Sequence, residues 1–435
     1  MSGFGSWGGY PPVVQKGVCL HSRQAELPAA QSILPYGLGR SYGDSCLNRD
    51  GVVVSSKALK NFIAFDNETG VLRCEAGVTL ADIIAALLPQ GWFLPVTPGT
   101  KYVTVGGAIA NDVHGKNHYG AGSFGNYLLR FELLRSDGSR LVCSAEENAD
   151  WYAATIGGLG LTGFITWAEI QMKPVQSRHI QSETIKYKNL AEFFDIAEAS
   201  EPEFEYTAAW LDCLASGDNL GRGHFIRGNH QPVDGMLGLP LTEKNKLTVP
   251  LRPPFSLINS LSLKAFNALY YERQRSEQQQ ALVDFDPFFY PLDGILNWNR
   301  IYGKKGFLQH QCVIPLAHAK AGITELLERI SAAGLGSFLV VLKMMGSVPS
   351  RGLLSFPQEG ATLAMDFPFQ GRKTLDLLNR LDEVVAQTGG RIYPAKDARM
   401  SAAMFQQAYP QWQQVEAKRD PNINSDFWRR VTGAQ

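Results

Sequence analysis

The chain has 435 residues, 45% of them apolar and 19% charged, which is the composition of an ordinary soluble globular protein. This length fits two large domains or about three average ones. Lysine and arginine together number 41, as do aspartate and glutamate, so no basic excess indicates a nucleic-acid partner.

The start of the chain has no basic head followed by an apolar run, so we expect no secretory signal. No stretch reaches the ~20 apolar residues of a transmembrane helix. The cysteines lie far apart without a CxxC pair, which favours reduced thiols over disulfides or a zinc site. We therefore expect a cytoplasmic protein or one attached peripherally to a membrane.

The N-terminal third mixes short strands and helices. Residues 61–77 alternate around a turn and predict a hairpin, and the stretch from Thr79 to Gly91 carries the end signals of a capped helix. A second hairpin turns at Asp137-Gly138, and Ser144 predicts the cap of the helix that follows. Because regular βαβ units are absent, we expect an α+β fold rather than a doubly wound sheet.

Three glycine-rich segments are candidates for contacting a cofactor. Residues 158–163 match G-x-G-x-x-G, but a helical pattern precedes them and a strand pattern follows, the reverse of the dinucleotide-binding order. We expect a tight helix-to-strand turn there, one that could still approach a cofactor. Residues 35–44, PYGLGRSYGD, can instead form a concave nest of backbone N–H groups that binds an anion, although an ordinary surface turn is the alternative.

The third segment, 97–126, is rich in glycine and poor in long side chains, as expected where backbone approaches a flat ligand. His114 and His118 are four apart, but Gly115 and Asn117 disfavour a helix between them, and no glutamate stands where a metalloprotease needs one. We expect no metal site. His114 is interpreted as a residue beside a ligand, with a structural histidine as the alternative.

Together the motifs GLGRSYGD (37–44), TPGTKYVTVGGAIANDVHGKNHYGAGSFGN (97–126) and GGLGLTG (157–163) resemble the FAD domain of the vanillyl-alcohol oxidase and p-cresol methylhydroxylase superfamily. Within it the chain is most similar to the decaprenylphosphoryl-β-D-ribose 2′-oxidase family. Further similarity, including FLVVLKMMG (338–346), AMDFPFQG (364–371) and GGRIYPAKDAR (389–399), extends the resemblance over nearly the whole chain.

The resemblance implies a two-domain fold of the p-cresol methylhydroxylase type. An FAD-binding domain would comprise residues 1–175 and be completed by residues 391–435. Residues 176–390 would form a substrate domain built on a large antiparallel sheet flanked by helices. The positions that match the cofactor contacts of the family are Gly37, Leu38, Gly39, Arg40, Ser41, Tyr42, Gly43, Gly99, Thr104, Val105, Gly106, Gly107, Asn111, Asp112, Val113, His114, Ile165, Tyr393 and Lys396.

The resemblance also implies catalytic positions and a substrate pocket. Lys396 would be the cation that stabilises negative charge on the reduced flavin. His114 and Lys343 are the first and second candidates for the base that removes the hydroxyl proton. Lys343 stands out independently, since it interrupts an apolar strand-like run. The substrate pocket would be lined by Tyr42, Tyr302, Gln309, Gln311 and Lys343.

Two departures from family patterns bear on the chemistry. Many relatives bind FAD covalently through a histidine where this chain has Arg40, so we expect non-covalent FAD. Mycobacterial members have a cysteine where this chain has Ala364, which puts inhibitor chemistry and the fine fit of the substrate in doubt.

The favoured function is oxidation of the 2′-hydroxyl of a polyprenylphosphoryl pentose to a 2′-keto sugar for arabinose-type cell-envelope precursors. An NAD(P)H-dependent keto-reductase would then be a partner. The alternatives are an FAD-dependent oxidase of a soluble polyol, sugar or aldonolactone, and a flavoprotein that has lost its redox chemistry and serves in binding or assembly.

Residues 230–255 hold many apolar side chains without a clear period. They are interpreted either as a mobile lid over the lipid end of the substrate that contacts the membrane, or as a packed excursion of the second domain. The residues on which this rests are Leu237, Leu239, Leu241, Leu247, Val249, Leu251 and Phe255, with Lys244, Lys246 and Arg252 among them.

Overall fold

The computed structural model describes residues 3–233, 246–254 and 256–433. Its N-terminal part contains a parallel three-stranded sheet of order β1-β3-β2 and a five-stranded antiparallel sheet of order β4-β5-β9-β7-β8. The strands are β1 (Lys16–Cys19), β2 (Ile33–Tyr36), β3 (Val52–Ser55), β4 (Phe62–Asp66), β5 (Val71–Glu75), β7 (Leu128–Leu134), β8 (Arg140–Ser144) and β9 (Phe164–Gln171). Both predicted hairpins are present, as β4-β5 and β7-β8.

The helices of this part are α1 (Leu80–Leu87), α2 (Val105–Ala110), α3 (His118–Ala121) and α4 (Ala149–Thr155). Thr79 caps α1 together with Asp82, as predicted. The prediction for α4 was wrong, because its N-cap is Asn148. The Ser144 hydroxyl instead accepts the backbone N–H groups of Glu146 and Glu147, so the same sequence signal closes a turn ahead of the helix.

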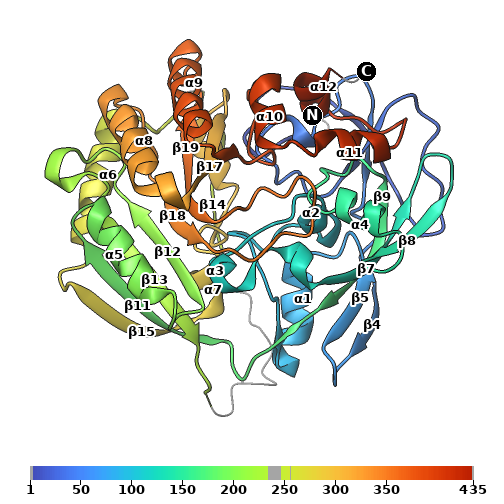
Figure 1. Cartoon of the computed structure of the whole chain (residues 1–435), viewed down its shortest axis with the longest axis horizontal. Helices are drawn as coiled ribbons and strands as arrows, with labels where there is room; N and C mark the ends of the chain where they lie inside the picture. Colours follow the sequence, from blue (N-terminus) through green and yellow to red (C-terminus); the bar gives the residue numbers. More distant parts are fainter. Residues whose placement is uncertain (1–2, 234–245, 255, 434–435) are drawn as a thin grey trace.

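The second part is built on one antiparallel sheet of eight strands, in the order β15-β11-β13-β12-β18-β19-β17-β20. These are β11 (His179–Tyr187), β12 (Tyr206–Leu211), β13 (Gly223–His230), β15 (Gln278–Asp284), β17 (Phe307–Pro315), β18 (Val340–Met345), β19 (Gly360–Pro368) and β20 (Arg391–Ile392). The helices α5 (Leu190–Ser200), α8 (Ala319–Ala333) and α9 (Arg372–Gln387) pack along its outer side (Figure 1). The expected α+β class with a large antiparallel sheet is confirmed.

Shorter elements complete the fold. They are β6 (Trp92–Phe93), β10 (Lys173–Pro174), β14 (Leu247–Thr248), β16 (Ile295–Leu296), α6 (Ser260–Glu272), α7 (Phe285–Phe289), α10 (Ala402–Ala408), α11 (Trp412–Lys418) and α12 (Asp426–Thr432). Across the described residues no helix combines the length and apolar character needed to cross a bilayer.

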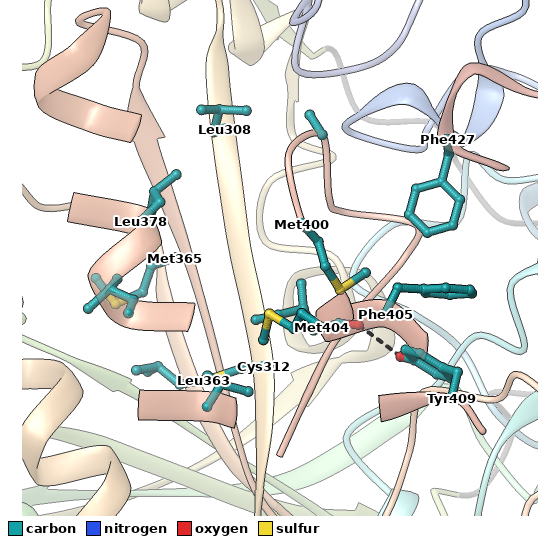
Figure 2. Packing of buried hydrophobic residues seen from close by; sticks show 14 of the residues in the cluster. Leu308, Cys312, Leu363, Met365, Leu378, Met400, Met404, Phe405, Tyr409 and Phe427 are labelled. Atoms are coloured by element: carbon teal, nitrogen blue, oxygen red, sulfur yellow. Dashed lines mark hydrogen bonds between the residues drawn. The ribbon is translucent and has the colours of Figure 1, made fainter. Parts of the chain in front are cut away.

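The C-terminal helices share a core with the large sheet. In Figure 2, Leu363, Met365 and Leu378 lie on one side of β17, and Met400, Met404 and Phe405 lie on the other. The hydroxyl of Tyr409 donates to the carbonyl of Ile392 in β20 at 2.8 Å. The last 40 or so residues are therefore anchored to the sheet by apolar burial.

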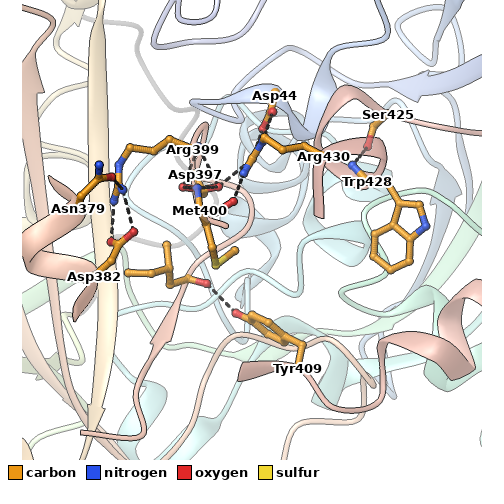
Figure 3. Close-up of polar contacts among 11 residues, drawn as sticks. Asp44, Asn379, Asp382, Asp397, Arg399, Met400, Tyr409, Ser425, Trp428 and Arg430 are labelled. Atoms are coloured by element: carbon orange, nitrogen blue, oxygen red, sulfur yellow. Dashed lines mark hydrogen bonds and ion pairs between the residues drawn. The ribbon is translucent and has the colours of Figure 1, made fainter. Parts of the chain in front are cut away.

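The same C-terminal segment also returns to the N-terminal part of the chain. Ile423 forms a parallel bridge with Ile33 of β2. The Arg430 guanidinium binds both carboxylate oxygens of Asp44 at 2.8 Å and one oxygen of Asp397 at 2.8 Å (Figure 3). Asp44 follows the glycine-rich loop 37–43, and Asp397 follows Lys396, so this cluster connects two segments expected to touch the cofactor.

The interpretation of residues 230–255 as a lid rests largely on positions outside the described residues, namely Leu237, Leu239, Leu241, Lys244 and Phe255. Of the described positions, Leu247 and Leu251 are exposed, and β14 pairs with β16. The Lys246 ammonium contacts the Tyr102 hydroxyl.

We predict that Arg430→Met lowers both stability and the amount of FAD that copurifies. Asp44 and Asp397 are 5% and 2% exposed, so the change leaves two buried carboxylates without their cation, at a cost of about 3 kcal/mol. Thermal unfolding and the absorbance of FAD per chain measure the two effects. Arg372→Met, at the exposed start of α9, is the matched control. Equal melting temperatures and FAD content in Arg430→Met and the control would contradict this role.

Candidate active site

A cavity of about 960 Å³ lies where the N-terminal loops, the large sheet and the C-terminal segment meet. This volume is at the upper end of the range for small-molecule sites. Its lining includes the loops within 35–46, 97–116 and 159–165, and the segment 393–396. Residues of the large sheet from β11, β12, β13, β15, β17, β18 and β19 also line it, as do residues of α6, α7 and the segment 291–298. Most of the site residues predicted from the sequence are thus brought to one cavity.

The glycine-rich loop offers free backbone donors to this cavity. Among the described residues, the backbone N–H groups of 37–41 have no acceptor. Gly39 has a φ of +63°, and a Cβ on Gly37 would lie 2.6 Å from the Thr104 hydroxyl oxygen, so both positions require glycine. Successive free N–H groups in a glycine-rich turn are typical of an anion nest.

Arg40 adds positive charge beside the nest. Its guanidinium lies 4.0 Å from the Trp7 ring centroid, and its Nε donates to the Tyr102 carbonyl at 3.1 Å. Arg40 also lines the cavity, with its other N–H groups not bonded to any described residue. Position 40 therefore holds a cation that is anchored beside the glycine-rich loop.

The second glycine segment adjoins the first, since Arg40 donates to the Tyr102 carbonyl and Gly37 lies against Thr104. The Thr104 hydroxyl caps α2 by accepting the Gly107 N–H at 3.1 Å, which turns Gly106 and Gly107 toward the cavity. Asn111 ends the helix, and its carbonyl accepts the Tyr393 hydroxyl at 2.8 Å. Gly99, Val113 and His114 from this segment, Ile165 of β9 and Tyr393 line the same cavity.

Four predicted site residues do not line it. Val105 is fully buried in the core, and a Cβ on Gly43 would lie 1.7 Å from the Asp397 carbonyl oxygen. The Asp112 carboxylate accepts hydrogen bonds from Ser123, Ser355 and the Gly125 backbone, so it fastens the loops behind the wall. Tyr302 stacks on Phe307 at 4.2 Å, one layer behind Tyr42.

The turn at 157–163 does connect α4 to β9, and it reaches the cavity with Leu159, Gly160 and Gly163. Sequence reasoning missed four charged residues of the wall, Lys116, Arg273, Asp293 and Asp366. The signal for Asp366 was present, because this acidic residue stands within an otherwise apolar strand, β19.

One end of the cavity holds buried bases. Gln311 donates its amide N–H to His114 Nε2 at 3.0 Å, and Lys343 donates to the Gly115 carbonyl at 2.7 Å. Burial, reinforced by Lys343, His118 and Lys396, lowers the pKa of His114 well below its usual value. Burial, with a contribution from Lys116, lowers the pKa of Lys343 to about 7.

A second charged group lies around Lys396. Its ammonium is 3.8 Å from the centroid of the Tyr42 ring. Asp366 accepts a hydrogen bond from the Gln309 amide at 2.6 Å. Burial lowers the pKa of Lys396 to about 8, and Asp366 counteracts that shift. The cavity therefore contains a lysine whose charge is maintained by a nearby carboxylate.

These features fit FAD. A nest of free N–H groups with an arginine suits a pyrophosphate, and a long glycine-lined wall suits an extended flat ligand. A buried lysine suits a ring that becomes anionic on reduction. Among the described residues, no group of three or more histidine, cysteine, aspartate or glutamate side chains is arranged to hold a metal.

Comparison with known proteins agrees with this chemistry. A family model for an FAD binding domain matches residues 26–144. Decaprenylphosphoryl-beta-D-ribose oxidase of Mycolicibacterium smegmatis is 35% identical over 434 residues, covering 97% of this chain and 93% of that protein. An uncharacterized protein of Streptomyces coelicolor is 31% identical over 371 residues, covering 81% of this chain and 100% of its own length.

More distant similarity covers a smaller share of the chain. Human Delta(24)-sterol reductase is 32% identical over 118 residues, which is 27% of this chain and 23% of that protein. The chain is an FAD-dependent oxidoreductase that acts on CH–OH groups. It belongs to the decaprenylphosphoryl-β-D-ribose oxidase family.

Proposed function

We propose that this enzyme oxidises the 2′-hydroxyl of a polyprenylphosphoryl pentose, such as decaprenylphosphoryl-β-D-ribose, to the 2′-keto sugar. The observation that carries the proposal is the single cavity, which joins an anion nest, a polar centre and an apolar end. The similarity to the mycobacterial oxidase over nearly the whole chain supports the same substrate class.

The FAD would lie along the two glycine segments. The nest at 37–41 and Arg40 would hold the pyrophosphate, Thr104, Gly106 and Gly107 would follow the extended cofactor, and Ile165 and Tyr393 would bound the ring. The contacts of 391–435 with β2 and Asp44 support a flavin unit made from residues 1–175 and 391–435.

We propose that FAD is bound without a covalent link, since the Arg40 side chain cannot form the bond that histidine forms in many relatives. Acid precipitation should therefore release the flavin into the supernatant. Flavin that stays with the precipitated protein would contradict this.

The bound flavin would accept the hydride of the alcohol carbon. Lys396 would stabilise the negative charge that the ring gains, and Gln309, Gln311 and Lys343 would orient the sugar. His114 would lie beside the ring, with its imidazole held by Gln311. Tyr42 would hold the lysine in place through the cation–π contact with its ring.

The apolar end of the cavity favours a lipid-linked substrate over a soluble polyol, sugar or aldonolactone. Its lining includes aromatic and aliphatic side chains from β12, α6, β16 and the two residues before β18. A small polyol would leave these side chains uncovered, namely Trp210, Phe266, Tyr270, Ile295, Leu296, Phe338 and Leu339. Each CH₂ group of a polyprenyl chain buried there contributes about 0.8 kcal/mol.

The surface next to this end also fits a membrane. On α6, Leu261 and Leu269 are 80% and 74% exposed and lie opposite the buried Leu263 and Tyr271. Leu247, Leu251 and Leu257 are exposed nearby in the chain, with Arg252 and Lys264 among them. Exposed leucines with basic neighbours are typical of peripheral attachment to anionic membranes.

The product would require a partner. A 2′-keto sugar becomes the arabinose-type epimer only when hydride is delivered to the opposite face of the carbonyl. An NAD(P)H-dependent keto-reductase supplies that chemistry, and would complete the synthesis of the cell-envelope precursor.

The substrate is tested by anaerobic mixing. Polyprenylphosphoryl ribose should bleach the 450-nm flavin band with saturation at low concentration, whereas free ribose and an aldonolactone should reduce it at least tenfold less efficiently, because they bury none of the apolar wall. Efficient reduction by a free polyol or lactone, with none by the lipid-linked sugar, would support the alternative oxidase instead.

Lys396→Met should weaken FAD binding and slow flavin reduction by about 10²–10³-fold, since a preorganised charge at the developing anion is removed. Titration of the apoprotein with FAD and stopped-flow reduction measure these effects separately. Lys373→Met, at the exposed start of α9, is the matched control. An unchanged reduction rate in the flavin-loaded variant would show that Lys396 does not contact the ring.

Membrane attachment is tested by replacing both Leu261 and Leu269 with glutamate. The double variant should sediment less with anionic vesicles than the parent protein, and its FAD spectrum should be unaltered. Leu316→Glu changes a leucine that is 53% exposed on another part of the surface and serves as the control. Equal sedimentation of all three proteins would rule out this face.

A further inference from the structure

Asp366 is a buried carboxyl group in the cavity wall that has no part in the oxidation as described so far. It lies on β19, directly opposite Gln309 of β17. The residue is 1% exposed, and its Oδ1 accepts the Gln309 amide at 2.6 Å. Its Oδ2 has no hydrogen-bond partner among the described residues.

Burying a carboxylate oxygen without a hydrogen-bond partner costs free energy, so we expect a ligand group to donate a hydrogen bond to it. Because Asp366 lines the cavity, a substrate can reach it. Besides Gln309, three groups interact electrostatically with Asp366. They are Tyr42 of the glycine-rich loop, Tyr302 behind it, and Lys396 of the C-terminal segment. Burial raises the pKa of Asp366 to about 7, and the Gln309 hydrogen bond and Lys396 oppose the shift.

The other two candidate bases are less suited to take up a proton. Gln311 donates to Nε2 of His114, which places the proton of the neutral ring on Nδ1 and leaves no free lone pair. Protonation of His114 or Lys343 would also create a cation in a buried region that already contains other lysines. An aspartate instead becomes neutral when it accepts a proton, which burial favours.

We propose that Asp366 is a catalytic residue whose free Oδ2 accepts the proton of the hydroxyl group that is oxidised. The inference rests on the proposed function and names the base of that reaction. The alcohol carbon would lose its C–H electron pair as a hydride, for which bound FAD would be the acceptor. The O–H bond breaks, its proton forms a bond to Oδ2, and its electron pair forms the second C–O bond of the ketone. Gln309 keeps the carboxylate oriented, and Lys396 favours its anionic form before the reaction.

Asp366→Asn tests the base, because it retains the shape and the oxygen that accepts from Gln309 but removes the basicity. Reduction of flavin-loaded protein by the lipid-linked pentose should slow about 10²–10⁴-fold. In the parent enzyme the rate should rise with pH and level off above about 7, where Asp366 is ionised. The variant should lose this rise. Asp376→Asn, on the exposed side of α9, is the matched control.

A second readout needs neither flavin nor turnover. A carboxyl whose folded pKa is raised binds more protons in the folded state, so it destabilises the fold progressively from pH 4 to pH 7 and fully above pH 7. Asp366→Asn removes this penalty. The melting temperature of the Asp366→Asn apoprotein minus that of the parent apoprotein should therefore increase from pH 4 to pH 7. The same difference for Asp376→Asn should not change with pH.

The outcomes separate this inference from the proposed function. If the lipid-linked pentose does not reduce the flavin of the parent enzyme, the proposed substrate is wrong. The melting experiment still tests Asp366 in that case. Asp366→Asn with an unchanged rate and pH profile overturns its role as the base. A difference in melting temperature that does not vary with pH shows that the group is not the buried carboxyl described here, and overturns the proposal as well.

Discussion

The bidentate contact of Arg430 with Asp44, together with its bond to Asp397, is the constraint on which the site depends. It connects the loop after the anion nest to the residue after Lys396, although these positions are more than 350 residues apart in the chain. Backbone bonds from Tyr42 to Ala395 and from Asp44 to Asp397 run beside it. The nest and the lysine are therefore parts of one rigid wall.

This arrangement explains why the C-terminal segment carries chemistry despite its position at the end of the chain. Its apolar side chains join the core of the large sheet, while its polar side chains join the N-terminal loops. The cavity forms between these attachments. Loss of either attachment would separate the phosphate-binding loop from the side chains that act on the flavin ring.

The charges inside the cavity have opposite effects on reactivity. Burial weakens the basicity of His114 and Lys343 and strengthens that of Asp366. The low polarity of the site therefore distinguishes the side chains by the sign of their charge. The site favours a carboxylate that becomes neutral when it takes up a proton. It also favours a lysine that stays positive beside a flavin ring that becomes negative. These two charge changes are the ones expected when a hydride and a proton are removed from an alcohol.

Local signals and the family resemblance identified much of this from the sequence. The capped helix at Thr79, both hairpins and the glycine segments are short-range features, and they occur where they were expected. The direction in which each side chain points could not be predicted from the sequence in the same way. Val105 and Asp112 lie inside cavity-lining segments but point into the core, and Ser144 closes a turn rather than capping α4. Asp366 could be recognised as a candidate base only from the structure, which shows that one of its carboxylate oxygens has no hydrogen-bond partner among the described residues.

A structure with FAD bound tests the placement of the cofactor most directly. We predict that the pyrophosphate oxygens lie within hydrogen-bond distance of the backbone N–H groups of 37–41, with the ring between the segments 111–114 and 393–396. A flavin bound elsewhere, or one whose pyrophosphate does not contact this loop, would contradict the central claim.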